Sequence, residues 1–226
     1  MNAAMPVIIF DVNETLSDMS PMGGHFREIG APAELAKLWF ATLLRDGFAL
    51  ASCKDNRPFA TMGEEALRGL LKGVKVNRPL DAAVEHVMNA MTGLSVHPDV
   101  PEGIEALASA GFRLMTLSNG SAQIAEKMLS EAGIRDKFEL LLSVEDAPAW
   151  KPVRASYDYA SAAFGADPSS MLLVAVHPWD IHGAARAGMR TAWVNRTGES
   201  YPGYFESPDF TVTALTELPG ALASTA

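Results

Sequence analysis

The sequence is poor in cysteine, in basic residues and in long hydrophobic runs. Cys53 is the only cysteine among 226 residues, so no disulfide can form within the chain, and a reducing compartment is expected. The 18 Lys and Arg residues are outnumbered by 27 Asp and Glu, which gives a net charge of −9 without a basic run. This argues against a nucleic-acid or anionic-membrane surface. The apolar run near the N-terminus is too short for a signal peptide or a membrane span, so we expect a cytoplasmic protein.

Short runs of β-branched and apolar residues alternate with helix-like stretches. Buried strands are predicted at Pro6–Phe10, Arg113–Leu117, Met171–Val176 and Thr191–Val194, with a weaker one at Phe138–Ser143. Helices, each followed by a glycine, are predicted at Glu102–Ala110, Ala122–Ala132, Ser156–Phe164 and Ile181–Ala187. Strands that alternate with helices indicate βαβ units, and therefore an α/β fold with a Rossmann-like parallel sheet.

Residues 18–97 break this alternation. They contain no convincing strand, and their Leu, Ala and Met residues at helical spacing predict helices at Ala33–Leu44, Arg57–Leu71 and Leu80–Met91. We therefore expect a helical cap at 18–97, inserted after the first strand, and a core formed by 1–17 and 98–226. The prolines of His97–Pro101 favour an extended return linker, because each disfavours helix in the residue before it.

Polar side chains follow the predicted strands. Asp11 follows the first strand, Ser118 and Asn119 follow the second, and His177 with nearby Asp180 follows the third. Because functional residues of parallel sheets gather beyond the carboxyl ends of the strands, we expect these side chains to share one rim of the sheet. Lys151, in the loop after the weak strand, joins them there.

Four segments resemble the ordered motifs of the haloacid dehalogenase superfamily. Phe10–Leu16 (FDVNETL) is similar to the first motif, Leu117–Gly120 (LSNG) to the second and Trp150–Pro152 (WKP) to the third, while Trp179-Asp180 with Gly183-Ala184 is similar to the fourth. The resemblance spans nearly the whole chain and implies a helical cap where the insert lies. It also implies that Asp11 is a covalent nucleophile.

Two absences separate branches of this superfamily. Its phosphatases carry a second aspartate in the first motif and a metal-binding aspartate in the fourth, where this chain has Asn13 and Val176. Magnesium needs carboxylate ligands, so neither a metal nor another cofactor is expected. The chain more closely resembles type II (S)-2-haloacid dehalogenases. In those enzymes the aspartate attacks C2 of a 2-haloalkanoate, halide leaves, and water opens the resulting ester.

The resemblance implies a catalytic set around Asp11. Lys151 would keep Asp11 ionised, and Asp180 would act as the base for the hydrolytic water. Thr15 would hold Asp11 through its hydroxyl, and Tyr157 would hydrogen-bond to Lys151 or Asp11.

A second set of residues would bind the substrate. The carboxylate needs donors, which Ser118, Asn119 and backbone N–H groups at a helix start can supply. We also count Ser118 in the catalytic set around Asp11. Val12 and Asn13 are expected to line the substrate site, and Trp179 the halide pocket.

The chain departs from the dehalogenase pattern at pocket positions. The arginine expected directly after the cap tryptophan is absent, since Trp39 is followed by Phe40-Ala41-Thr42, and the nearest arginine is Arg45. Ala175 and His177 stand where a small hydroxyl and an amide are usual. Arg45, His177 and Trp39 are thus the candidates for the halide site. If the imidazole of His177 faces the pocket, we expect a neutral ring near Asp180 that shares the role of base or orients the hydrolytic water. The alternative is that His177 hydrogen-bonds to the cap and only sets the shape of the pocket.

Other functions remain open at this point. A magnesium-dependent phosphatase-like hydrolase, a divergent hydrolase of another substrate and a binding protein without turnover all share these motifs. The dehalogenase interpretation implies a small carboxylate as substrate and a homodimer as assembly, without nucleic-acid or membrane partners.

Overall fold

The structure is a computed structural model that describes residues 7–224, and its centre is a parallel sheet. Six strands pair in the order β3-β2-β1-β4-β5-β6, all parallel. They are β1 Val7–Phe10, β2 Arg113–Ser118, β3 Phe138–Ser143, β4 Met171–Ala175, β5 Arg190–Val194 and β6 Phe210–Val212. This confirms the predicted α/β fold. Pro6, the first residue of a predicted strand, lies outside the described residues, and the short edge strand β6 was not predicted.

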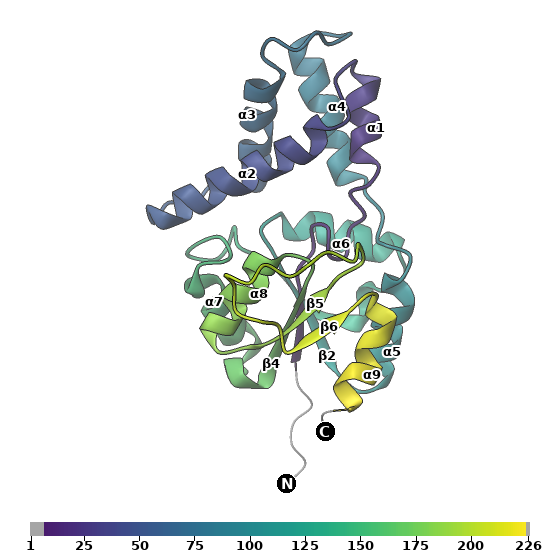
Figure 1. Cartoon of the computed structure of the whole chain (residues 1–226), viewed down its shortest axis with the longest axis vertical. Coiled ribbons are helices and arrows are strands. Elements are labelled where there is room, and N and C mark those ends of the chain that lie inside the picture. The colour runs from purple at the N-terminus through teal and green to yellow at the C-terminus, as the bar shows by residue number, and fades with distance from the viewer. Residues whose placement is uncertain (1–6, 225–226) are drawn as a thin grey trace.

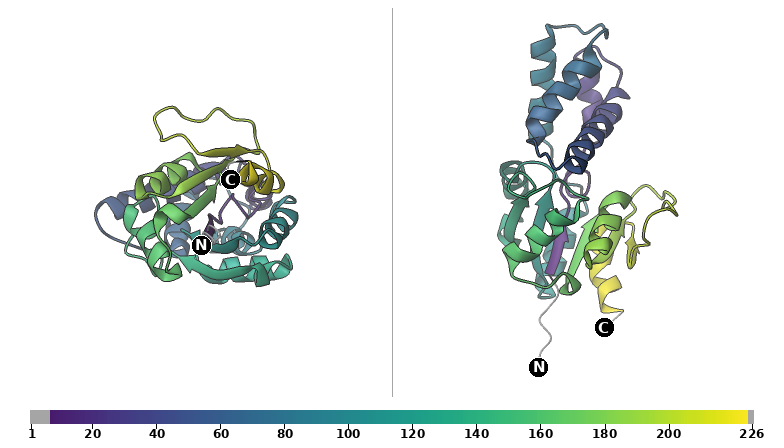
Figure 2. Two further views of the ribbon diagram at one scale, coloured as in Figure 1. Left: turned by 90° about the horizontal axis from the view of Figure 1, so that it is seen from below. Right: turned by 90° about the vertical axis from the view of Figure 1, so that its left-hand side faces the viewer.

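Helices cover both faces of this sheet (Figures 1 and 2). They are α5 Val100–Ser109, α6 Ala122–Glu131 and α9 Leu218–Ala223 on one face, and α7 Arg154–Phe164 and α8 Pro178–Ala187 on the other. The central strand β1 serves both layers, because successive side chains of a strand point to opposite faces. Ile8 and Phe10 pack in the first layer, and Val7 and Ile9 in the second.

The remaining helices stand above the carboxyl ends of the strands (Figure 1). They are α1 Met22–Glu28, α2 Leu35–Ser52, α3 Phe59–Leu71 and α4 Leu80–Thr92, and we call them the cap. The two connections to the core run side by side, joined by an antiparallel bridge between Ser17 and Val96. The backbone N–H of Asp18 donates to Ser95 and that of His97 to Leu16, at 2.8 and 2.9 Å.

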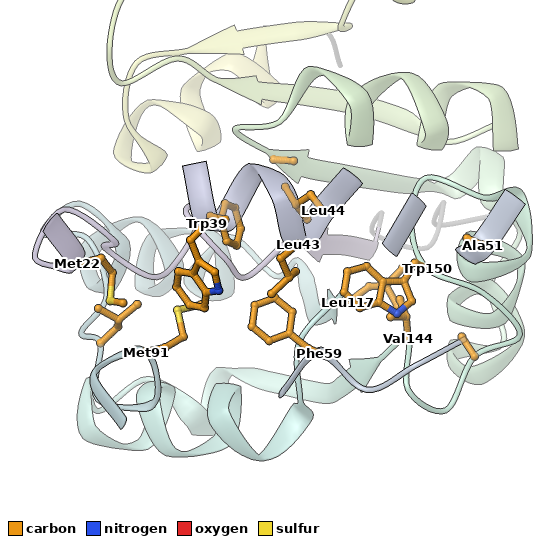
Figure 3. Close-up of a cluster of buried hydrophobic side chains, with 14 of the residues drawn as sticks. Met22, Trp39, Leu43, Leu44, Ala51, Phe59, Met91, Leu117, Val144 and Trp150 are labelled. Atoms are coloured by element: carbon orange, nitrogen blue, oxygen red, sulfur yellow. The ribbon is translucent and has the colours of Figure 1, made fainter. Parts of the chain in front are cut away.

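The cap packs on the core through aromatic side chains (Figure 3). Phe59 of α3 stacks on Trp150 of the core, with ring centroids 6.1 Å apart and planes 11° from parallel. Gly47 of α2 lies directly over the Trp150 ring, where a Cβ would come within 2.4 Å of Cε3. Trp150 Nε1 also donates to the carbonyl of Arg57, at 3.1 Å. The segment that carries Lys151 is therefore fixed from above by the cap.

Several helix boundaries differ from those predicted. The short helix α1 was not predicted, and α2 continues beyond Leu44 to Ser52 through Gly47, whose missing side chain makes room for Trp150. Helix α5 begins at Val100, inside the predicted extended linker. Pro101 is tolerated there because a proline in the first helical turn has no intrahelical N–H bond to lose. Among residues 7–224, no helix combines the length and apolarity needed to cross a membrane.

Candidate active site

Asp11, Lys151 and Asp180 meet at the carboxyl ends of the strands. Asp11 directly follows β1, Lys151 lies in the loop after β3, and Asp180 lies in the first turn of α8 after β4. Lys151 Nζ donates to Asp11 Oδ1 at 2.8 Å and to Asp180 Oδ2 at 2.6 Å. All three side chains are buried. Their charges therefore interact strongly, since little water screens them.

This arrangement sets the charge state of the site. Burial alone would raise the pKa of Asp11, but the Lys151 charge and a hydrogen bond from His177 outweigh it and hold the pKa well below its usual range. Burial raises the pKa of Asp180, against the opposing effect of Lys151. Burial alone would lower the pKa of Lys151, yet the two carboxylates raise it. At neutral pH the site thus holds an ionised Asp11 beside an ammonium, and Asp180 is the more basic carboxylate.

Thr15 and Tyr157 hold the two carboxylates in place. Thr15 Oγ1 donates to Asp11 Oδ2 at 2.7 Å, which is the predicted contact, and accepts the backbone N–H of Val176 at 3.1 Å. Tyr157 does not reach Lys151 or Asp11 as predicted. Its hydroxyl donates to Asp180 Oδ1 at 2.6 Å.

The position of Tyr157 depends on a glycine of the fourth motif. A Cβ at Gly183 would come within 2.5 Å of the Tyr157 hydroxyl. The absence of a side chain there lets the phenol pass over α8 and reach Asp180. The Gly183-Ala184 pair was the signal in the sequence that could have indicated this contact.

His177 differs most from its predicted role. Its Nδ1 lies 3.0 Å from Asp11 Oδ2, and its Nε2 lies 2.9 Å from Glu14 Oε2. Burial alone would lower the pKa of His177, but the hydrogen bonds to Asp11 and Glu14 raise it to about 9. The predicted neutral imidazole near Asp180 is therefore wrong. His177 is an imidazolium that bridges two carboxylates, because its extended backbone before Pro178 turns the ring toward the loop after β1.

Glu14 and Phe40 complete the surroundings of His177, and neither was predicted as a site residue. Glu14 has a left-handed backbone with φ 61°. Phe40 lies over the other side of the rim, with its ring centroid 6.4 Å from that of His177. Trp179 stacks on the same imidazole at 4.8 Å. Phe40 occupies the position directly after Trp39, where a guanidinium was expected, and presents an apolar ring instead.

The other two halide candidates lie away from this cluster. Arg45 is 71 % exposed, donates to Asp46 through Nε, and lines a groove between α2 and α3. Trp39 is buried inside the cap, where Nε1 donates to the Gly63 carbonyl at 3.0 Å. His177 is at the rim, but both of its ring nitrogens are engaged by carboxylates. None of the three offers a free donor to a halide at Asp11.

Ser118 and Asn119 lie at the end of β2. Ser118 Oγ accepts the backbone N–H of Gly120 at 2.8 Å, which leaves its hydroxyl proton able to donate. Asn119 closes a pair of hydrogen bonds with the backbone of Lys151, at 3.2 and 3.0 Å. The Asn119 side chain therefore positions Lys151 rather than pointing free into the site.

A small cavity lies between cap and core beside these residues. Val12 and Asn13 line it with Ser118, all three being predicted site residues, and Phe59 and Met91 close it from the cap. Apolar side chains of the cap thus meet both polar and apolar side chains of the core at one space. The cavity volume is about 10 Å³, which is enough for a water molecule.

Comparison with known proteins shows the family of this chain. A family model described as haloacid dehalogenase-like hydrolase matches residues 5–188. The chain belongs to this family. It is 33 % identical over 211 residues to an (S)-2-haloacid dehalogenase of Pseudomonas sp. (strain YL), covering 92 % of this chain and 90 % of that one.

Further relatives of this hydrolase are similar in sequence or in structure. It is 37 % identical over 122 residues to haloacetate dehalogenase H-2 of Moraxella sp. (strain B), covering 54 % of each chain. The crystal structure of a dehalogenase superposes with a TM-score of 0.89 at 29 % identity, covering 99 % of both chains. The L-2-haloacid dehalogenase of Xanthobacter autotrophicus with chloropropionic acid covalently bound, at 23 % identity and a TM-score of 0.88, shares the fold.

Proposed function

We propose that this haloacid dehalogenase-like hydrolase cleaves the carbon–halogen bond of a small 2-haloalkanoic acid through an ester on Asp11. One observation carries the proposal. The Lys151 ammonium lies between Asp11 and Asp180, so both carboxylates remain buried and usable without a metal ion between them. The family membership and the (S)-2-haloacid dehalogenase relative support the same chemistry.

In the first step a carboxylate oxygen of Asp11 attacks C2 of the substrate. Oδ1, which has one hydrogen-bond partner, is freer than Oδ2, which has two. A carbon–oxygen bond forms as the carbon–halogen bond breaks, and halide leaves with the bonding electron pair. The Ser118 hydroxyl and nearby backbone N–H groups hold the substrate carboxylate, while the aromatic rings of Phe40 and Trp179 border the rim.

In the second step water attacks the ester carbon of Asp11. Asp180 accepts a proton from the water, as its raised pKa favours. The negative charge that develops on Oδ2 is stabilised by the Thr15 hydroxyl and the His177 N–H, which already bond to that oxygen. The bond from the Asp11 carbon to the alkoxide oxygen then breaks, and the alkoxide takes the proton from Asp180. A 2-hydroxy acid is released, and Asp11 loses its remaining proton to solvent.

Halide release from 2-chloropropionate tests this function directly. We expect release to persist in EDTA and p-nitrophenyl phosphate with Mg²⁺ to remain uncleaved. Asp180→Asn should accumulate the ester, seen as a mass increment on the peptide that contains Asp11, and Asp11→Asn should show none. Phosphatase activity that depends on Mg²⁺, without halide release, would assign the chain to the other branch that Asn13 and Val176 argue against.

A further inference from the structure

A second cluster of ionisable side chains lies in the cap. His25 and Glu28 belong to the last turn of α1, and His86 belongs to α4. His25 Nδ1 lies 3.2 Å and His86 Nε2 2.9 Å from the same carboxylate oxygen, Glu28 Oε2. The three ligand atoms all lie within 4.8 Å of one another. Two imidazoles from different helices thus converge on one carboxylate.

The chemistry of this cluster suits a transition metal. The hydrogen bond from His25, aided by that from His86, lowers the pKa of Glu28, so the carboxylate is charged at neutral pH. Each imidazole can move its proton to the other ring nitrogen and present a lone pair where it now meets Glu28. Two histidine nitrogens and one carboxylate oxygen form a ligand set that zinc accepts, with a fourth position for water.

The backbone around Glu28 is already fixed. Its carbonyl accepts hydrogen bonds from Asn77 Nδ2 at 2.9 Å and Arg78 Nη2 at 2.8 Å. The backbone N–H of Asn77 also donates to the Ile29 carbonyl at 2.9 Å. The segment before α4 is therefore tied to the end of α1, so a metal would need only small side-chain movements.

The cluster is open to solvent. The side chains of His25, Glu28 and His86 are 32, 56 and 28 % exposed, which leaves a path for an ion to enter. Arg78 is a nearby cation, and its guanidinium bonds to the backbone oxygen of Glu28 rather than to the carboxylate.

We propose that His25, Glu28 and His86 form a binding site for a divalent metal ion of the zinc type, which ties α1 to α4. These are the first and last helices of the cap, so the ion would hold the end of α1 against α4. The site is separate from the chemistry at Asp11 and does not depend on it.

Zinc titration of the full-length protein tests the site. Cys53→Ser is the background, because it removes an exposed thiol that could compete for the ion. Calorimetry with Zn²⁺ should show one ion per chain, and the ion should raise Tm by roughly 5 °C at about 100-fold excess over Kd. Binding should weaken on acidification, because protons compete with the ion for histidine and carboxylate ligands.

Variants then assign the ion to these residues. His86→Ala and Glu28→Gln should each weaken Zn²⁺ binding by roughly tenfold or more, since each removes one of three protein ligands. His182→Ala is the matched control, because His182 is a histidine of α8 outside the cap and should leave binding unchanged. Equal affinity in His86→Ala, loss of binding in His182→Ala instead, or no uptake of Zn²⁺ near pH 7.5 would each overturn the proposal.

Discussion

His177 Nε2 lies 2.9 Å from Glu14 Oε2, on the opposite side of the ring from the nitrogen that meets Asp11. The imidazolium is therefore held by one carboxylate that reacts and by one that does not. Glu14 is half-exposed, so it can keep His177 protonated without itself being part of the buried triad of Asp11, Lys151 and Asp180.

Removal of this partner should shift the pH profile. In Glu14→Gln the imidazolium loses one charged acceptor, so its pKa of about 9 should fall toward neutrality. We attribute the loss of kcat/KM at alkaline pH to deprotonation of His177. This loss should therefore occur roughly one pH unit lower in the variant. Profiles of kcat/KM from about pH 6 to about pH 10 measure this shift. Glu64→Gln, at an exposed glutamate of the cap, is the control and should leave the profile in place. An alkaline limb that stays in place would separate Glu14 from the charge state of His177.

Replacement of His177 should remove the imidazolium altogether. His177→Asn keeps an amide donor near Asp11, so we expect a loss of roughly tenfold in kcat rather than abolition, together with loss of the limb near pH 9. The acid limb of the pH profile should move to higher pH, because Asp11 loses a partner that lowers its pKa. An unchanged profile with altered KM alone would limit His177 to shaping the pocket.

The same residue should make stability depend on pH. The pKa of His177 is raised on folding, so the proton stabilises the native state fully below about 6.5, and this contribution is lost as pH rises through about 9. Urea unfolding should therefore show the native protein losing on the order of 2 kcal/mol between these limits. His177→Asn should lose much less over the same range, and equal losses in both proteins would contradict the assignment.

Lys151 should be required for folding stability as well as for catalysis. Lys151→Met leaves two buried carboxylates without their counter-charge, which should cost about 3–5 kcal/mol. The variant should regain stability as pH falls, because protonation of one carboxyl relieves the repulsion. Unfolding curves near pH 5 and near pH 8 compare the two states. A variant equally stable at both would show that the carboxylates are screened by something other than Lys151.

The contact between cap and core should depend on Gly47. In Gly47→Ala the new methyl would lie 2.4 Å from Trp150 Cε3, so α2 or the Trp150 ring must shift, at a cost of about 1–3 kcal/mol. Gly69→Ala is the matched control, because a Cβ there meets nothing within 4 Å and should stabilise α3 by about 0.5–1 kcal/mol. Thermal unfolding of both variants measures the difference, and a stabilised Gly47→Ala would exclude the close packing.

The sequence predicted the parts of this molecule that local patterns determine. Buried apolar runs marked five of the six strands, and the polar residues after them identified Asp11 and Asp180 as neighbours. Edge strand β6 was missed because three residues carry too little pattern. The Glu14–His177 contact was missed because Glu14 has a left-handed backbone. Glutamate rarely adopts this conformation, and no neighbouring residue in the sequence predicts it. Phe40 could be placed beside Trp39 on a helix, but not over His177, since that depends on how α2 lies across the rim.

The antiparallel bridge between Ser17 and Val96 holds together the two connections between the sheet and the helical insert. In the topology of the sheet, the insert therefore acts as one long loop whose two ends are held next to each other. Exchange of such a loop changes neither the strand order nor the path of the chain at Asp11, and lengthening it adds only a slowly growing entropic cost. The helices of the insert can therefore vary among related chains while Asp11 and the strands keep their positions.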